Sequence, residues 1–138
     1  MIVLPDVLAP NLDIVFCGTA VGEKSALMQA YYAGLGNSFW PTLYKVGLTP
    51  YQLRPKEYRE ILRWKLGLTD LVKDISGNDR CLSAAQFDRR RLERLAIENF
   101  PRIVAFTSKR AARGFFGHSA DYGLARSTVG KTMLFVLP

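Results

Sequence analysis

The sequence predicts an α/β fold in which a central, mainly parallel sheet of four strands is covered by helices on both faces. Short apolar runs typical of buried strands recur along the chain, and amphipathic helical patterns separate them. Strands that alternate with helical crossovers form parallel sheets. The apolar runs cover residues 14–17, 68–72, 103–107 and 133–137.

Two helices are expected between the first and second strands. Asn37 is a suitable N-cap for a helix that continues through Val46, because its side chain can accept a hydrogen bond from the free N–H groups of the first turn. Pro55 opens the other helix, since its fixed φ suits a first helical position, and Gly67 ends it.

A third helix is expected between the second and third strands, where Ser83 and Gln86 form a capping-box pattern. The arginines at positions 89–91 are expected to point outward, and Pro101 stops the helix. After the third strand, another helix opens at Lys109. The apolar stripe of the third helix is expected to consist of Phe87, Leu92, Leu95, Ala96 and Phe100.

Composition narrows the class of protein. The chain has 138 residues, an apolar content of 49% and a formal net charge of +7. This length favours one domain, and the charge favours a polyanionic partner such as a nucleic acid. Two cysteines without a CxxC pattern and a single histidine favour neither a zinc site nor a disulfide framework. With no signal-peptide pattern and no membrane-spanning run, we expect a cytoplasmic, intracellular monomer.

The most informative segment is DIVFCGTAVGEKS at 13–25, where an apolar strand breaks into a tight turn and a helix start. Gly18 and Gly22 let the backbone approach a ligand closely, and the junction gathers unpaired N–H groups that suit a nucleotide or a base. A tight turn without a ligand is the alternative. A P-loop has glycine where this chain has Glu23, whose carboxylate would repel phosphates, so a P-loop-like nucleotide-binding enzyme is disfavoured.

Ligands of parallel sheets lie beyond the carboxyl ends of the strands. Residues 18–25, 70–79 and 107–110 follow the first three strands and are therefore expected to share one site. Lys109 and Arg110, which open the helix after the third strand, are the expected contacts to DNA phosphates.

Five segments carry a resemblance to the mismatch-specific uracil and thymine DNA glycosylases of the uracil-DNA glycosylase superfamily. VFCGTAVG at 15–22 is similar to the family's VFCGINPG, and YYAGLGNSFWPTLYKVGLTPYQL at 31–53 resembles its segment with N-x-F-W and a following G-L-T. LGLTDLV at 66–72, PRIVAFTSKRAA at 101–112 and FVLP at 135–138 also fit in order and spacing. The resemblance covers nearly the whole chain.

This resemblance implies a three-layer α/β/α fold and a glycosylase that flips a base out of the duplex, leaves an abasic site and uses water, with no metal or cofactor. Uracil is the expected base, together with thymine or other damaged pyrimidines opposite guanine, in double-stranded and also single-stranded DNA. Since the sequence ends at Pro138, we expect a single domain over 1–138 without the family's C-terminal wedge loop and last helix.

The family's pattern also implies site residues. Tyr32 falls where an aromatic ring stacks on the base, and Ser25 and Asn37 lie near the pocket. Phe39 and Trp40 are expected to pack in the core. A flipped pyrimidine needs backbone donors for its carbonyl groups. These are expected from the turn that contains Gly18, Thr19, Ala20 and Gly22.

Ala20 replaces the asparagine that positions the attacking water in this family, and a methyl group forms no hydrogen bond. A carboxylate can activate water or stabilise an oxocarbenium-like sugar. Asp70 and Asp79 are the expected catalytic substitutes, ahead of Glu23. The alternative function is a catalytically weak module of the same fold that binds damaged or single-stranded DNA.

Overall fold

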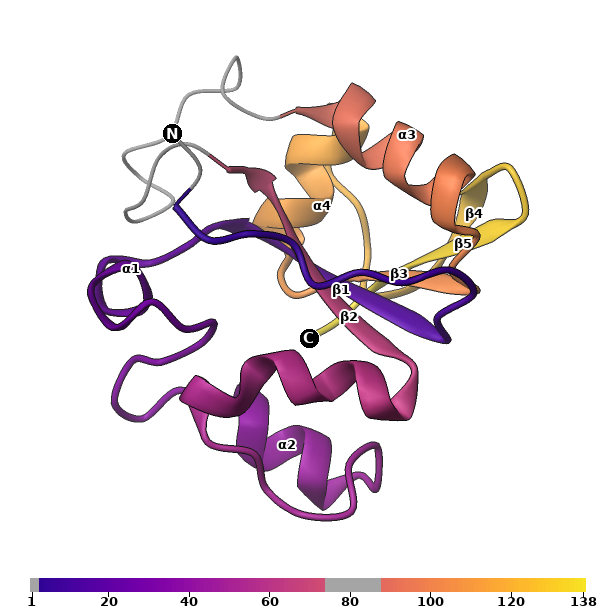
Figure 1. Cartoon of the computed structure of the whole chain (residues 1–138). Coiled ribbons are helices and arrows are strands. Elements are labelled where there is room, and N and C mark those ends of the chain that lie inside the picture. Colours follow the sequence, from indigo (N-terminus) through magenta and orange to yellow (C-terminus); the bar gives the residue numbers. More distant parts are fainter. Residues whose placement is uncertain (1–2, 74–87) are drawn as a thin grey trace.

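One mixed sheet forms the centre of the molecule (Figure 1). The computed structural model describes residues 3–73 and 88–138, and its sheet has the strand order β2-β1-β3-β5-β4. The first four of these strands run parallel, and β4 pairs antiparallel with β5. The strands are β1 (Ile14–Ala20), β2 (Leu66–Val72), β3 (Ile103–Phe106), β4 (Gly123–Val129) and β5 (Thr132–Val136).

Helices cover both faces of the sheet. In Figure 1, α3 (Arg89–Asn99) and α4 (Lys109–Phe116) lie above it, whereas α2 (Phe39–Lys45) and the 3₁₀ helix η1 (Pro55–Trp64) lie below. Alternate side chains of β1 enter two separate apolar clusters, with Phe16 on the α2 side and Val15 on the α3 side. The predicted three-layer α/β/α fold is therefore confirmed.

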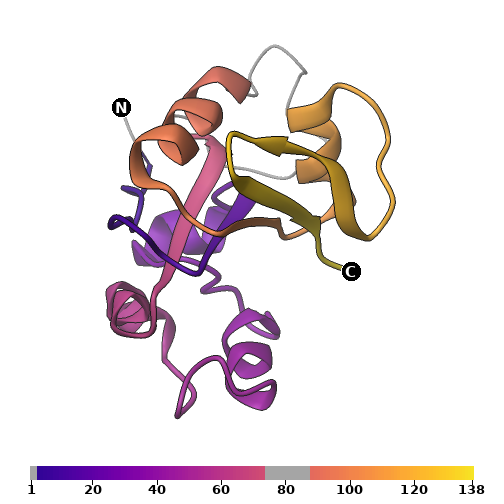
Figure 2. The same cartoon turned by 90° about the vertical axis from the view of Figure 1, so that its right-hand side faces the viewer.

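The sheet has five strands where the sequence predicts four. The additional strand, β4, forms the edge of the sheet in a hairpin with β5 (Figure 2). Most of its residues are exposed, so it lacks the apolar run that marks a buried strand. A turn signal does precede β5, because Gly130 has a φ of 59° between the two strands.

The helix predicted from Asn37 begins slightly later. Ser38 is the N-cap of α2, while Asn37 Oδ1 accepts a hydrogen bond from Phe39 N at 2.9 Å just before it. The second predicted helix ends at Trp64, with Lys65 in the left-handed conformation as its C-cap. Gly67 does not end that helix, because it lies inside β2.

The third predicted helix differs at both ends. Ser83, Gln86 and Phe87 lie outside the described residues, and α3 begins at Arg89 after Asp88, whose side chain accepts a hydrogen bond from Arg91 N. The expected apolar stripe is confirmed at Leu92, Leu95 and Ala96, which are buried. Phe100 is instead 64% exposed, because it takes a left-handed C-cap conformation with a φ of 52° that turns it off the stripe.

Gly67 is required by a close approach of the N-terminal segment. Val7 and Leu68 exchange two backbone hydrogen bonds of 2.9 Å across β2, and a Cβ on Gly67 would lie 2.6 Å from the Val7 carbonyl oxygen. We expect Gly67→Ala to lower the free energy of unfolding by about 2 kcal/mol, because neither backbone can move aside freely. Urea denaturation measures this loss. Gly22→Ala is the control, since a Cβ there meets nothing within 4 Å, and an equal loss in both variants would contradict the prediction.

Candidate active site

A pocket of about 420 Å³ opens at the carboxyl ends of the parallel strands. The loop after β1, Asp70 of β2 and Thr107 after β3 line it together, along with the segment that follows α1 (Glu23–Met28). The structure thus brings together the described parts of the three loops that parallel topology places at one edge. It also gathers the residues proposed from sequence, namely Gly18, Thr19, Ala20, Gly22, Ser25, Tyr32, Asn37 and Asp70.

The loop after β1 is held in place by a buried hydroxyl group. Gly22 is the N-cap of the six-residue helix α1, and its carbonyl oxygen accepts a hydrogen bond from Ala26 N. The Ser25 side chain is buried and accepts a hydrogen bond from Ala33 N at 2.9 Å. Ser25 therefore ties the chain that follows α1 to the rim of the pocket.

Three oxygen atoms converge at the buried end of the pocket, around Gly18. A Cβ on Gly18 would lie 3.0 Å from Asp70 Oδ1, 3.5 Å from Tyr32 Oη and 3.6 Å from Thr107 Oγ1. The Thr107 hydroxyl donates to the Cys17 carbonyl oxygen at 3.4 Å, whereas the buried Tyr32 hydroxyl has no hydrogen-bond partner among the described residues. Glycine at position 18 thus leaves space beside a polar surface, which we call the pocket floor.

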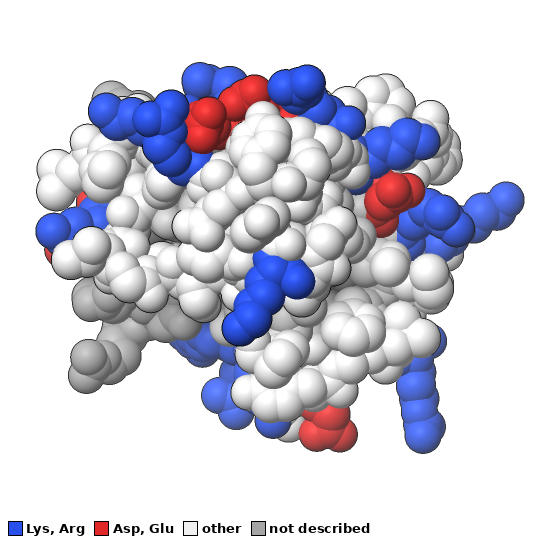
Figure 3. All heavy atoms as spheres, turned by 90° about the horizontal axis from the view of Figure 1, so that it is seen from below, with Lys and Arg blue, Asp and Glu red and all other residues white. Residues whose placement is uncertain are grey.

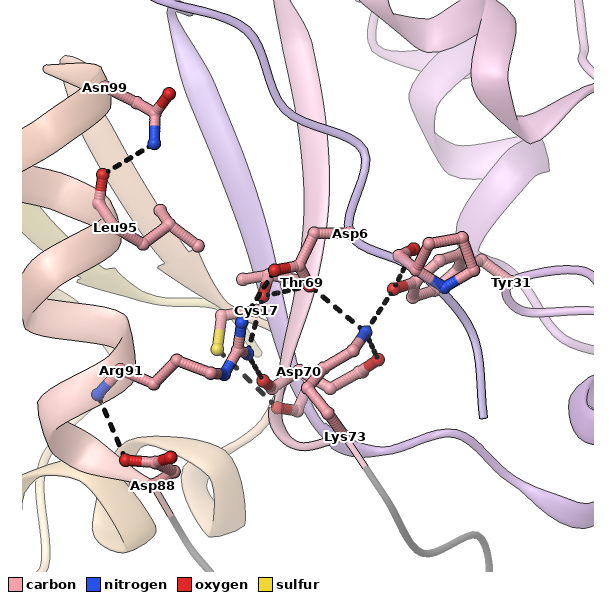
Figure 4. A network of polar contacts seen from close by, with 12 residues as sticks. Asp6, Cys17, Tyr31, Thr69, Asp70, Lys73, Asp88, Arg91, Leu95 and Asn99 are labelled. Atoms are coloured by element: carbon pink, nitrogen blue, oxygen red, sulfur yellow. Dashed lines mark hydrogen bonds and ion pairs between the residues drawn. The ribbon is translucent and has the colours of Figure 1, made fainter. Parts of the chain in front are cut away.

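The carboxylate of Asp70 is held from behind by Lys73 (Figure 4). The Lys73 ammonium donates to Asp70 Oδ2 at 3.2 Å and to Tyr31 Oη at 2.7 Å, and lies 3.1 Å from Asp6 Oδ1. The Lys73 ammonium, which has three donors, thus faces three oxygen partners. Asp70 Oδ2 is consequently occupied, and Oδ1 is the oxygen presented beside Gly18.

Arg91 completes this network from α3. Its guanidinium bonds to Asp6 Oδ2 at 2.6 Å and to Thr69 Oγ1 at 3.0 Å, and it also donates to the backbone carbonyl of Asp70. The Thr69 hydroxyl in turn donates to Asp6 Oδ1 at 2.7 Å. The expectation that Arg91 points outward is wrong, because two buried β2 residues and Asp6 offer it acceptors that a solvated position lacks.

Burial sets the protonation of the groups at the floor. It raises the pKa of Asp70 above the ordinary value of 3.8, although the Lys73 ammonium lowers it. Burial and then the charge of Asp70 raise the pKa values of Tyr31 and Tyr32. Both phenols thus keep their protons at neutral pH, and the Tyr32 hydroxyl can donate a hydrogen bond. Burial also raises the pKa of the Cys17 thiol, which disfavours a reactive thiolate.

The aromatic residues near the pocket divide between core and site. Trp40 is buried, and its indole N–H donates to the Tyr31 carbonyl oxygen at 3.0 Å. Phe39 stacks on Tyr32 with ring centroids 3.9 Å apart and packs against the apolar cluster on the α2 side. The predicted core packing of Phe39 and Trp40 is therefore confirmed. A base stacked on Tyr32 would need the face opposite Phe39.

A protein-family model, that of the uracil DNA glycosylase superfamily, matches residues 5–138. The chain belongs to the uracil DNA glycosylase superfamily. Its members are DNA glycosylases, which are hydrolases of base excision repair, and the positive net charge of this chain agrees with a DNA partner. The parallel sheet and its two helical layers agree with this assignment. Within residues 3–73 and 88–138, no helix is both long and apolar enough to span a bilayer.

Two of the three carboxylates expected from sequence, Asp70 and Glu23, line the pocket. Asp79 lies outside the described residues, and Asp70 lies at the floor with only 3% of its surface exposed. Glu23 lines the same pocket and is exposed to solvent. Sequence reasoning missed the roles of Lys73 and Asp6, because neither belongs to a motif.

Lys109 and Arg110 do not line the pocket at Gly18. Both follow Ser108, which does, and they line a neighbouring hollow of about 440 Å³ together with Arg113. The Lys109 ammonium lies 4.3 Å from the centroid of the Tyr122 ring. Seen from the α2 side, Lys and Arg side chains are spread mostly along the edge of this face, with a basic side chain also across its middle (Figure 3).

Proposed function

We propose that this protein is a monofunctional DNA glycosylase that flips uracil out of DNA into the pocket at Gly18 and hydrolyses its N-glycosidic bond. The convergence of Asp70 Oδ1, Tyr32 Oη and Thr107 Oγ1 on one buried point is the observation that supports it most directly. Buried polar atoms in proteins normally have hydrogen-bond partners, so three oxygens side by side are unexpected in an apolar core. The polar edge of a bound base would supply such partners. Thymine and other damaged pyrimidines opposite guanine are the further proposed substrates.

Asp70 recognises the base in this proposal. Uracil presents a ring N–H between two carbonyl groups, and an ionised carboxylate accepts hydrogen bonds only. With the Lys73 ammonium beside it, Asp70 is ionised in this proposal, so Oδ1 accepts from N3–H. The Tyr32 hydroxyl donates to an adjacent carbonyl oxygen, in place of the ring stacking that the family's pattern implies for this residue. Cytosine carries a lone pair at N3, which the carboxylate repels. Lys73 balances the charge of Asp70, so the floor does not repel the uracil anion that leaves.

The reaction takes place at the exposed end of the pocket. A base whose far edge meets the buried floor places its sugar toward solvent, and Glu23 is an exposed carboxylate of the pocket lining. Glu23 takes a proton from water as the water oxygen attacks C1′, and the electrons of the broken N1–C1′ bond leave with uracil. Ala20 also lines the pocket, and its methyl group forms no hydrogen bond to this water. Asp79, the other candidate carboxylate, remains an alternative for the same step.

Incubation with uracil-containing duplex and single-stranded oligonucleotides tests the proposed function. We expect release of free uracil over multiple turnovers, with abasic sites revealed by alkaline scission, in buffer that contains a chelator. Thymine opposite guanine in the same sequence tests the wider substrate range. DNA binding without base release would instead support the alternative, a damaged-DNA or single-stranded-DNA binding module. Ala20 favours this alternative, because its methyl group cannot position water.

Lys109 and Arg110 are proposed to contact DNA phosphates near the pocket. We expect the double variant Lys109→Gln/Arg110→Gln to weaken binding to all sequences and to reduce the slope of log K against log salt by about one for each lost contact. Salt titrations by fluorescence anisotropy measure this. The matched control is Arg102→Gln/Lys131→Gln, an exposed pair at the amino end of the parallel strands. Equal slopes for the wild type and the Lys109/Arg110 variant would contradict the proposal.

A further inference from the structure

Leu35 is the most exposed large apolar residue of those that the structure describes, and it lies at the rim of the pocket. Its surface is fully exposed, at 101% of the reference value, while Gly34 and Asn37 on either side line the pocket. An exposed leucine on its own needs no explanation. This one lies between two residues that line the pocket.

The backbone presents Leu35 rigidly. Asn37 N donates to the Gly34 carbonyl oxygen at 3.0 Å, which closes a four-residue turn with Leu35 at its first corner. Gly36 follows with a φ of 82°, the value that the second corner of a type II turn requires. The hydrogen bond from Ala33 N to Ser25 Oγ anchors the turn to α1. A side chain that projects from such a turn loses little further backbone entropy when it is buried.

We infer that Leu35 is an apolar wedge that enters the DNA base stack beside the flipped nucleotide. This inference rests on the proposed function and extends it to the duplex around the site. Proteins that unstack DNA insert leucine and similar side chains between neighbouring bases. Leu35 and the pocket share one rim. When the protein binds DNA with this rim, Leu35 therefore unstacks the duplex while the pocket receives the base. Lys24, whose Cβ lies 4.0 Å from the place of a Cβ on Gly34, supplies a cation on the same rim.

A wedge can be distinguished from a residue that only supports folding, because a wedge affects excision only from DNA in which the bases are stacked and paired. We expect Leu35→Ala to lower uracil excision from duplex DNA by about tenfold, and excision from single-stranded DNA by less than about twofold. Gly36→Ala, which strains the turn at positive φ, should cause a smaller loss of the same kind. The control is Ile97→Ala, an exposed apolar residue on α3 whose loss should change neither rate. Equal losses on both substrates, or none on duplex, would overturn the inference.

A second measurement separates the wedge from catalysis. With 2-aminopurine next to the uracil, we expect the wild type to raise the fluorescence on binding, because the probe is unstacked, and Leu35→Ala to raise it much less. A rise in fluorescence without base release would reject the proposed glycosylase activity and keep the wedge. Base release without a difference between the two proteins in fluorescence would reject the wedge alone. Neither signal from the wild type would reject both.

Discussion

Asp70→Ala is expected to lower kcat/KM for uracil excision by about a hundredfold, a loss typical of removing one well-placed polar group from an active site. Of the three oxygens of the pocket floor, Asp70 Oδ1 is the nearest to the place of a Cβ on Gly18, and among the described residues Asp70 is the buried carboxylate of the pocket lining. Without it, the N3–H of uracil would be buried with no acceptor. Single-turnover kinetics on a uracil duplex measure the loss.

The same substitution should leave the fold intact. Burial raises the pKa of Asp70, so between 3.8 and the raised value the folded protein binds more protons than the unfolded chain. The contribution of Asp70 to the free energy of unfolding therefore falls as pH rises through that window. Asp70→Ala should remove this fall, which urea denaturation at acidic and neutral pH can detect. Lys73 keeps Asp6 and Tyr31 as partners in the variant.

Asp13→Ala is the matched control for both measurements. Asp13 precedes β1 at the opposite end of the sheet, and its side chain is 47% exposed in a long contact of 3.9 Å with Arg102. It should retain wild-type excision and stability, since an exposed ion pair contributes little. If Asp70→Ala excised uracil as fast as Asp13→Ala, Asp70 would not contact the base.

The position of the pocket follows from sequence because it depends on topology. Apolar runs mark β1, β2, β3 and β5, and parallel strands bring the loops that follow them to one edge. Glycine at position 18 also signals a close approach, and the structure explains it by the three oxygens around it. These features depend on local patterns that a single sequence carries.

The polar network behind Asp70 depends on tertiary contacts, so no local pattern in the sequence indicates it. Asp6 lies in an irregular segment, and a backbone pairing of Val7 with Leu68 brings it to β2. Arg91 stands in a run of three arginines that is typical of a solvated helix face, yet it alone of the three turns inward. β4 is missed for a related reason, because an edge strand with exposed side chains has no apolar run. Residues that support a site through other residues are therefore the hardest to find.

Lys73→Met is expected to have two effects, because Lys73 positions Asp70 and also neutralises it. Breaking a mostly buried ion pair should lower the free energy of unfolding by about 3 kcal/mol, since Asp70 and Asp6 lose their shared cation. Lys73 lowers the pKa of Asp70, so its loss should raise that pKa further and move the acid limb of the excision profile to higher pH. Single-turnover rates across pH and urea denaturation measure the two effects.

Two further variants separate charge from geometry at Lys73. Lys73→Arg keeps the positive charge, so the acid limb should stay near its wild-type position even where the altered shape lowers the rate. Lys56→Met removes an exposed lysine of η1 and should change neither stability nor the pH profile. An acid limb that stays unmoved in Lys73→Met would mean that ionised Asp70 is not the form that binds the base. A shift of the alkaline limb instead would assign that role to the protonated carboxyl group, which donates to a carbonyl oxygen of uracil.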